Sequence, residues 1–367
     1  MTDNEKFGEV ETQTLAVEER KKSRSKKIGL LGNYADTDET RFLLTPEACG
    51  MLCSGGYTVK MEADAGVDIS FSDENYAEYG VEIVTRDEAL QSDKVLSYAP
   101  INKEDILKMK DGAILLCMMD NSLFDKQIIE TLLKKNITLG CFDNMLSYNS
   151  MPVFADIIAE INGLASMVYV QDYLSFLGGG KGVLLSSVAG LNPCEILVIG
   201  DGTDVYAACK AGIRAGAYVT LMINDVSALM NARQEVGFGL NTNMIHPRVL
   251  YNKVKSADVI LLGRCTREFE LPKKLSLAMK ESVYILDMQK QSPSVTVPRT
   301  VAMALSNVLV NFFDEMQMKD GFDSMVATTS GVQCGIVTYK GKLVDKLIGS
   351  YLGLPAVDIK MMLAPIN

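Results

Sequence analysis

An α/β protein with two mostly parallel sheets is the architecture that this 367-residue chain predicts. Short apolar runs alternate with amphipathic helical patterns from residue 27 onward, which is typical of parallel strands joined by covering helices. A second series of the same kind contains the buried-strand pattern Glu195–Ile199, which runs directly into the glycine turn Gly200-Asp-Gly202. Two such series, in a chain long enough for two cores of ordinary size, predict two domains.

The first series predicts six strands with helices between them. The helical pattern that begins at Pro46 has Thr45 as its N-cap and Gly55-Gly56 beyond its end, as helix starts and stops favour. Apolar residues also recur at helical spacing in Phe124–Lys135. The predicted strands are Lys27–Leu31, Tyr57–Glu62, Val81–Val84, Lys94–Tyr98, Ala113–Met119 and Ile137–Phe142.

The second series follows a long helical pattern, Phe154–Leu177, which ends at the triplet Gly178-Gly-Gly180. Another helical pattern, Arg299–Met318, leads out of this series. The alternation between them again favours a parallel sheet covered on both faces. The strands predicted here are Glu195–Ile199, Tyr218–Ile223, Asp258–Gly263 and Ser282–Asp287.

Composition narrows the classes of partner. A net charge of −10 argues against nucleic acid and against an anionic membrane surface. No apolar run is expected to reach the length of a bilayer span, and the polar residues 1–26 lack the apolar core of a secretory signal. The eight cysteines show no paired metal-binding spacing, so we expect free thiols, no metal and a cytoplasmic location.

The turn Gly200-Asp-Gly202 starts a Gly-x-Gly-x-x-Gly dinucleotide-binding pattern in which Val205 stands at the third glycine. The first glycine allows the tight turn, the second lets the backbone approach a pyrophosphate, and the third lets helix and strand pack closely. Gly200 and Gly202 keep the first two roles, whereas we expect the β-branched Val205 to spoil the third. The pattern predicts a Rossmann-like domain whose cofactor site is altered.

The acidic groups around this pattern are also unusual. The acidic residue that normally accepts the ribose hydroxyls at the end of the second strand is replaced by Ile223, and Asp225 is the candidate substitute. Asp201 and Asp204 bring carboxylates to a helix N-terminus that should receive pyrophosphate, and Asp204 can cap that helix itself. The candidate cofactor-binding residues are Gly200, Gly202, Thr203 and Asp225.

Several segments carry a family resemblance that spans nearly the whole chain past residue 26. Glu39-Thr-Arg41-Phe-Leu-Leu-Thr-Pro46 looks like an N-terminal Glu-x-Arg-Val-x-x-Thr-Pro motif, and Gly180–Gly190 looks like a Gly-Lys/Arg-Gly-Val-Leu-Leu segment. On these motifs the chain resembles the alanine dehydrogenase / nicotinamide nucleotide transhydrogenase N-terminal family. The other matching segments are Ala65–Ile83, Pro298–Asn307 and Lys340–Ile359.

The resemblance implies two Rossmann-like domains that face each other across a cleft. Residues 1–26 would be a polar lead-in, residues 27–150 plus 310–367 the substrate-type (catalytic-type) domain, and residues 151–309 the dinucleotide-binding-type domain. It also implies reversible reductive amination of pyruvate, with hydride passing to or from NAD(H). The implied partners are a small amino or 2-oxo acid and further copies of the chain, as a dimer or a hexamer.

The catalytic positions of the family carry over incompletely. Arg41 matches the arginine that would anchor a substrate carboxylate, whereas the family's lysine falls on Tyr98 and its acid/base histidine falls on Asp120. Each of these three candidate catalytic residues has a structural alternative. Arg41 can pair with a carboxylate within the first domain, Tyr98 can pack as a strand aromatic, and Asp120 can be a strand-end or turn residue. The single histidine, His246, lies in the glycine-loop domain as a loop or helix-start residue.

A further departure lies between Asp287 and Pro298, where ten residues replace a longer excursion of the family. Gln289–Pro293 stand where the family has an Asp-Gln-Gly-Gly segment. That excursion normally closes part of the cleft, so its loss alters the expected site.

Three functions follow as hypotheses. The first is a non-catalytic or strongly impaired paralogue that keeps the two-domain scaffold and associates with itself or with an active relative. The second is an active NAD(P)-dependent oxidoreductase on an amino or 2-oxo acid, with Arg41 as the carboxylate anchor. The third is a regulatory protein that binds a small molecule without transfer chemistry. The substituted positions favour the first, because losing several acid/base and binding groups costs many orders of magnitude in rate.

Overall fold

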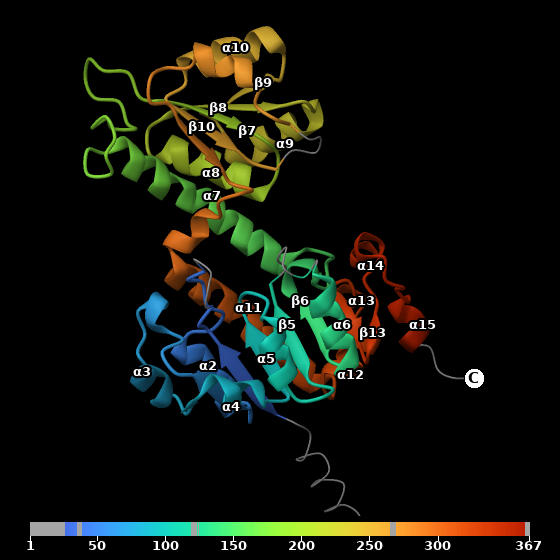
Figure 1. The fold of residues 1–367 in the computed structure, drawn as a ribbon. Coiled ribbons are helices and arrows are strands. Elements are labelled where there is room, and N and C mark those ends of the chain that lie inside the picture. The colour runs from blue at the N-terminus through green and yellow to red at the C-terminus, as the bar shows by residue number, and fades with distance from the viewer. Residues whose placement is uncertain (1–25, 35–38, 119–122, 124, 265–268, 364–367) are drawn as a thin grey trace, which may run out of the picture. The chain divides into compact units, whose positions relative to one another are not determined.

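A computed structural model describes residues 26–34, 39–118, 123, 125–264 and 269–363 (Figure 1). The chain divides into two compact units. Unit 1 comprises residues 1–38, 42–152 and 306–367, and unit 2 comprises residues 39–41 and 153–305. The assignment of residues 27–150 plus 310–367 to a substrate-type domain, and of residues 151–309 to a dinucleotide-binding-type domain, stays a prediction.

Unit 1 is built on an eight-stranded sheet in the order β13-β12-β6-β5-β4-β1-β2-β3. Strands β1 to β6 run parallel to one another, whereas β12 is antiparallel to both β6 and β13. The strand order reverses between β4 and β1, so the carboxyl ends of these two strands meet at a topological switch point. The strands are β1 (Lys27–Leu31), β2 (Thr58–Glu62), β3 (Glu82–Val84), β4 (Lys94–Ser97), β5 (Ile114–Cys117), β6 (Thr138–Cys141), β12 (Ile336–Tyr339) and β13 (Lys342–Leu343).

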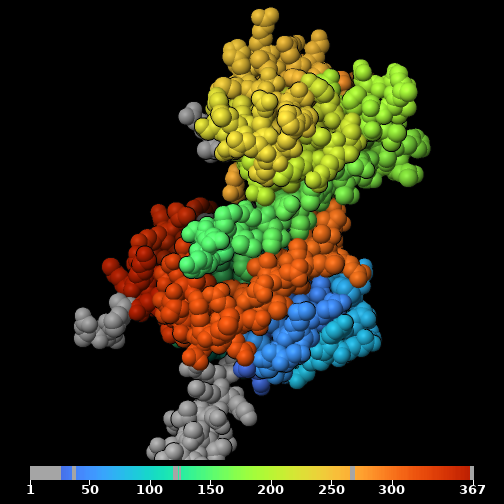
Figure 2. Space-filling model, turned by 180° about the vertical axis from the view of Figure 1, so that it is seen from behind, coloured from blue at the N-terminus to red at the C-terminus, as the bar shows by residue number. Residues whose placement is uncertain are grey.

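Apolar helices cover the unit 1 sheet. Helix α2 begins after Thr45, whose Oγ1 accepts the Ala48 N–H at 3.4 Å, as the predicted N-cap should. The later part of α11 packs against the N-terminal segment, where the rings of Tyr57 and Phe313 meet edge to face at 5.5 Å. Figure 2 shows this orange helix bordering the blue segment. The helices of unit 1 are α2 (Pro46–Ser54), η1 (Val67–Ile69), α3 (Asp73–Ala77), α4 (Arg86–Leu90), α5 (Lys103–Lys108), α6 (Lys126–Lys134), η3 (Phe142–Asn144), the later part of α11 (Pro298–Met318), α12 (Phe322–Thr328), α13 (Ser330–Gln333), α14 (Lys346–Leu352) and α15 (Ile359–Leu363).

Unit 2 carries a five-stranded, fully parallel sheet in the order β11-β10-β7-β8-β9. Its order reverses between β7 and β10, which are in register so that Ile199 lies opposite Leu262. Gly200 and Gly263 therefore leave their strands side by side. The strands are β7 (Glu195–Ile199), β8 (Tyr218–Ile223), β9 (Asn241–Met244), β10 (Val259–Leu262) and β11 (Tyr284–Asp287). The α/β class with two Rossmann-like, mostly parallel sheets is confirmed.

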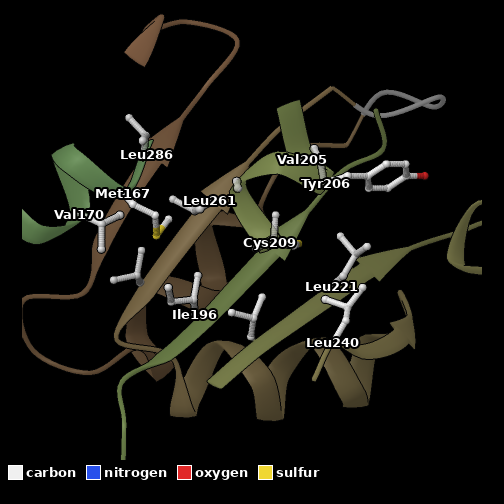
Figure 3. Close-up of a cluster of buried hydrophobic side chains, with 14 of the residues drawn as sticks. Met167, Val170, Ile196, Val205, Tyr206, Cys209, Leu221, Leu240, Leu261 and Leu286 are labelled. Carbon is white, nitrogen blue, oxygen red and sulfur yellow. The ribbon is translucent and has the colours of Figure 1, made fainter. Parts of the chain in front are cut away.

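Alternate residues of the unit 2 strands enter different cores, because successive side chains on a strand point to opposite faces. Ile196 and Val198 pack with α7, α8 and α9, whereas Leu197 and Ile199 pack with α10 and η4. Figure 3 shows the first of these clusters, to which α7 and α8 both contribute. The helices of unit 2 are α7 (Val153–Leu174), α8 (Thr203–Arg214), α9 (Val226–Val236), α10 (Pro247–Ser256), η4 (Lys273–Ala278), η5 (Pro293–Thr296) and the start of α11.

Helix α7 corrects one sequence expectation. It spans 22 residues, with a mean hydropathy of 1.5 in its most apolar stretch, and by length and composition it could cross a membrane. No other helix in the described part of the chain meets this criterion. The same apolar composition serves the unit 2 core, where Met167 and Val170 of α7 are buried against the sheet (Figure 3).

Candidate functional site

The glycine turn after β7 needs both of its glycines. Gly200 and Gly202 have φ angles of +142° and +129°, which residues with a side chain rarely adopt. A Cβ on Gly200 would lie 2.8 Å from the carbonyl oxygen of Arg264, so no larger residue fits there. The turn thus keeps the first two glycine roles that the sequence predicts.

Val205 does not disturb the packing of α8, contrary to the sequence expectation. Its side chain is completely buried in the unit 2 core. A Cβ on Gly263 would lie only 2.2 Å from Cγ2 of Val205, so a glycine at the end of β10 makes the room that the usual third glycine makes on the helix. Helix α8 and the end of β10 therefore still pack closely, with the glycine at the end of the strand instead of on the helix.

The carboxylate of Asp204 lies over the first turn of its own helix. The backbone N–H of Val205, one of the donors that a helix start leaves without an intrahelical partner, favours the ionised form of this carboxyl. Burial raises the pKa of the Asp204 carboxyl, while this N–H and the positive charge of Arg264 oppose the rise. The N-cap of α8 is Gly202 and Asp204 lies within the first turn, so the alternative in which Asp204 caps the helix stays a prediction.

Asp201 and Thr203, the other polar residues of the turn, are also bonded within unit 2. The Asp201 N–H donates to the carbonyl oxygen of Arg264 at 2.6 Å. The Tyr206 hydroxyl donates to the Asp201 carboxylate, and burial together with this carboxylate raises the pKa of Tyr206. Thr203, a predicted cofactor residue, lies with its Oγ1 3.4 Å from the carboxylate of Asp156 on α7.

The ribose-recognition end of the site lies after β8. Ile223 is the last residue of β8 and is buried. Asp225 is exposed and forms the N-cap of α9, where its Oδ1 accepts the Ala228 N–H at 3.0 Å. One carboxylate oxygen of Asp225 is thus already committed to the helix.

Arg41 is held in an ion pair rather than presented alone. Its Nε and Nη2 donate to the two carboxylate oxygens of Glu39 at 2.7 and 2.6 Å, which is the bidentate geometry that a substrate carboxylate would use. Its Nη1 donates to the hydroxyls of Ser292 and Ser294 at 2.8 and 2.9 Å. The Arg41 and Glu39 side chains are only 12% and 14% exposed.

Neighbouring contacts fix this arrangement inside unit 2. The Asn162 side chain on α7 accepts from the Ser292 hydroxyl at 2.8 Å and from the Ser294 N–H at 2.9 Å. Thr40 donates its hydroxyl to the carbonyl oxygen of Val295 at 2.9 Å. The short connection after β11 therefore supplies the partners that hold Arg41.

Tyr98 and Asp120 belong to unit 1. Tyr98 follows β4 and is 4% exposed; its N–H donates to the hydroxyl of Tyr34 at 2.8 Å, and its carbonyl oxygen accepts the Met118 N–H at 2.9 Å. This placement agrees with the packing alternative for Tyr98. Asp120 lies outside the described residues. His246 is the N-cap of α10 in unit 2, which agrees with the expected helix start.

An ion-paired network lies beside the unit 1 switch point. Glu62, at the end of β2, accepts the N–H groups of Gly32 and Asn33, both at 3.2 Å. Arg86 donates to Glu62 at 2.8 Å and to Asp105 at 2.8 Å. The backbone donors after β1, like those after β7, are thus directed at a carboxylate of the same unit.

Metal ligation finds no support in the described residues, where no group of three or more His, Cys, Asp or Glu side chains could hold an ion. The cysteines in that part of the chain are free thiols, and five of them are buried. Burial raises the pKa of Cys49, Cys194 and Cys209, which keeps these thiols protonated and unreactive.

Comparison with known proteins decides the family. The family models described as "Alanine dehydrogenase/PNT, N-terminal domain" and "Alanine dehydrogenase/PNT, C-terminal domain" match residues 33–160 and 167–266. The chain belongs to the alanine dehydrogenase/PNT family. An alanine dehydrogenase of Mycolicibacterium smegmatis is 25% identical, over 89% of this chain and 97% of the relative. One of Methanococcus maripaludis is 28% identical, over 67% of this chain and 66% of the relative.

Solved structures of this family share the fold. An L-alanine dehydrogenase superposes with a TM-score of 0.77 at 19% identity, covering 89% of this chain and 99% of that one. A transhydrogenase from Sinorhizobium meliloti superposes with a TM-score of 0.73 at 16% identity, covering 87% of this chain and 100% of that one. At these identities the likeness establishes the arrangement of strands and helices.

Sequence reasoning missed the residues that engage the predicted ones. Glu39 belongs to the motif that carries the family resemblance, and its two-residue spacing from Arg41 is a signal for a local pair. Gly263, at the end of a predicted strand, carried a signal of the same kind, since a glycine there leaves space for a neighbour. Ser292 and Asn162 are 130 residues apart, and no local pattern joins them.

Proposed function

We propose that this chain is a catalytically impaired or non-catalytic paralogue of the alanine dehydrogenases that keeps their two-domain scaffold. The observation that carries the proposal is Tyr98, which stands at the position of the family's lysine, is 4% exposed and supplies no cation. The pairing of Arg41 with Glu39, within a Glu-x-Arg motif that the family shares, adds to it. A carboxylate anchor has to offer its guanidinium to the substrate, and here the Nε–Nη2 edge faces Glu39 while Nη1 faces Ser292 and Ser294.

Binding a 2-oxo acid at Arg41 would therefore require Glu39 to be displaced. Four N–H donors of Arg41 are accounted for by Glu39, Ser292 and Ser294. Displacing Glu39 breaks a poorly exposed ion pair, which is costly. Tyr98, at the position of the family's lysine, is buried and supplies no cation.

The experiment is an assay of the purified chain in both directions, with alanine and NAD⁺ and with pyruvate, ammonium and NADH. We expect kcat/KM at least about 10⁴-fold below that of an alanine dehydrogenase run in parallel, since an acid/base group alone contributes about 10²–10⁴. Arg41→Ala should lower the free energy of unfolding by about 2–3 kcal/mol, because Glu39 loses its partner.

Arg233→Ala is the matched control, since Arg233 is an exposed arginine on α9. It should change the free energy of unfolding by less than about 0.5 kcal/mol. Measurable turnover by the wild type that Arg41→Ala abolishes, with unfolding unaffected, would overturn the proposal and establish an active oxidoreductase with Arg41 as its anchor.

A further inference from the structure

The switch point of the unit 2 sheet is the place where ligands bind in open α/β sheets, in the crevice outside the carboxyl ends of the strands. Here β7 and β10 end side by side at Gly200 and Gly263. The turn after β7 is bonded to the segment after β10, because the Asp201 N–H donates to the carbonyl oxygen of Arg264 at 2.6 Å. A Cβ on Gly200 would lie 2.9 Å from the carbonyl carbon of Gly263, which shows how closely the two segments approach.

The Asp204 carboxylate lies in the remaining space between these segments. Its Oδ1 is 3.2 Å from the place of a Cβ on Gly202, and its Oδ2 is 3.6 Å from the place of a Cβ on Gly263. The Val205 N–H at the start of α8 favours its ionised form. A pyrophosphate bound to this pattern would use the same glycine surface and the same helix N-terminus.

The first turn of α8, which carries Asp204, is packed tightly against α7. A Cβ on Gly163 of α7 would lie 2.1 Å from the carbonyl oxygen of Asp204 itself. On the other side, Val205 fills the space above Gly263. Asp204 is therefore fixed at the start of α8 from two sides, and the residues present do not fit a dinucleotide as they stand.

We propose that Asp204 is an internal occupant of the diphosphate position and the residue that excludes NAD(H) and other nucleotide diphosphates from unit 2. This inference rests on the proposed function and gives the reason why its cofactor site is closed. Two other carboxylates add repulsion: Asp201, which neighbours Asp204, and Asp156, which lies against Thr203. Arg264 is the cation that faces Asp204.

Calorimetric titration of the full chain with NAD⁺ and with ADP-ribose tests the proposal, with adenosine as the probe that lacks phosphate. The wild type should show no saturation up to about 1 mM ligand, in the range of a very weak complex. Asp204→Ala should bind ADP-ribose at least tenfold more tightly than the wild type and leave adenosine unchanged. Asp204→Ser, which keeps a helix-start hydroxyl but is shorter, should give the same gain and serves if the alanine variant does not fold.

Two matched variants separate occupancy from charge. Asp204→Asn keeps a side chain of the same size in the position, and Asp156→Asn removes one nearby negative charge without emptying it. Occupancy predicts no gain for either variant. An equal gain in Asp204→Asn and Asp156→Asn would overturn the proposal in favour of simple charge repulsion. So would wild-type binding as tight as that of Asp204→Ala, or no gain in either shortened variant.

These outcomes are distinct from a failure of the proposed function. Turnover by the wild type would refute catalytic impairment, and it is measured without any variant of Asp204. Binding of ADP-ribose to Asp204→Ala without turnover would support both, because the diphosphate position would be open while Arg41 stayed paired with Glu39.

Discussion

The ionised carboxylate of Asp204, at the start of α8, lowers the conformational stability of the protein. Burial raises the pKa of its carboxyl, so the folded protein holds the proton more tightly than the unfolded chain does. A raised folded-state pKa contributes stability that is fully present below the unfolded pKa of about 3.9 and is lost as pH rises through the folded value. At neutral pH the ionised Asp204 therefore works against folding, although the Val205 N–H favours its ionised form.

Asp204→Asn should consequently stabilise the protein at pH 7. The amide oxygen can accept the Val205 N–H, while the desolvation of a charge is removed. We expect a higher thermal midpoint for the variant at pH 7, with the difference from the wild type shrinking as pH falls toward 4. Circular dichroism melts at pH 7, 5.5 and 4.5 measure this, and a variant that is less stable at every pH would contradict it. Asp201 and Arg264 also face this carboxyl, so both belong to the same titration.

The helix α8 is placed by glycines on its neighbours rather than on itself. Gly163 lets α7 approach the first turn of α8, and Gly263 accepts Val205. In this chain a glycine after β10 gives the room that a glycine on the helix gives in the usual dinucleotide-binding pattern. The helix therefore carries a larger side chain, Val205, in its first turn.

The Val205–Gly263 exchange predicts a strong pairwise coupling. Gly263→Ala puts a Cβ against Cγ2 of Val205 and should destabilise the wild type by about 1–3 kcal/mol, as overpacking of a core does. In a Val205→Ala background the same substitution should cost less, giving a coupling of about 0.5–3 kcal/mol in a double-mutant cycle. Urea unfolding of the four proteins measures it. Equal costs in the two backgrounds would show that Gly263 is not the partner of Val205.

At the scale of the whole molecule, one segment exposes more apolar surface than a single chain needs. Four large apolar side chains in the segment after α7 are mostly exposed. They are Phe176 (82%), Leu177 (97%), Leu184 (70%) and Leu191 (69%). Exposed apolar patches mark association sites. We propose that copies of this chain associate through this segment.

Light scattering coupled to gel filtration should give a particle of two or six times the mass of one chain. Leu184→Glu should shift it toward the monomer, because a charge would be buried in the contact. Leu277→Glu is the control, since Leu277 is 94% exposed on η4 and lies outside the segment. A monomeric wild type, or equal shifts in both variants, would count against association through residues 176–191.

Periodicity and glycine placement predict the strands that form apolar runs, because those signals are local. The runs at Lys27–Leu31 and Glu195–Ile199 became β1 and β7 with the predicted bounds. Residues Asn241–Met244 were missed as β9, since their polar side chains give no apolar run, and pairing with β8 decides their conformation. The hairpin strand Ile336–Tyr339 joins the unit 1 sheet through pairing with β6, nearly 200 residues away in the chain.

The sequence by itself determines which residue types this chain has at the motif positions. Only the tertiary structure determines which neighbours those residues contact. The absent lysine and histidine and the valine in the glycine pattern are visible in the letters alone. The state of Arg41 depends on Glu39, Ser292 and Ser294, and the consequence of Val205 depends on Gly263. Hydrogen bonding and packing act over a few ångströms in space, so residues 250 positions apart can determine whether an arginine binds a substrate or a neighbour.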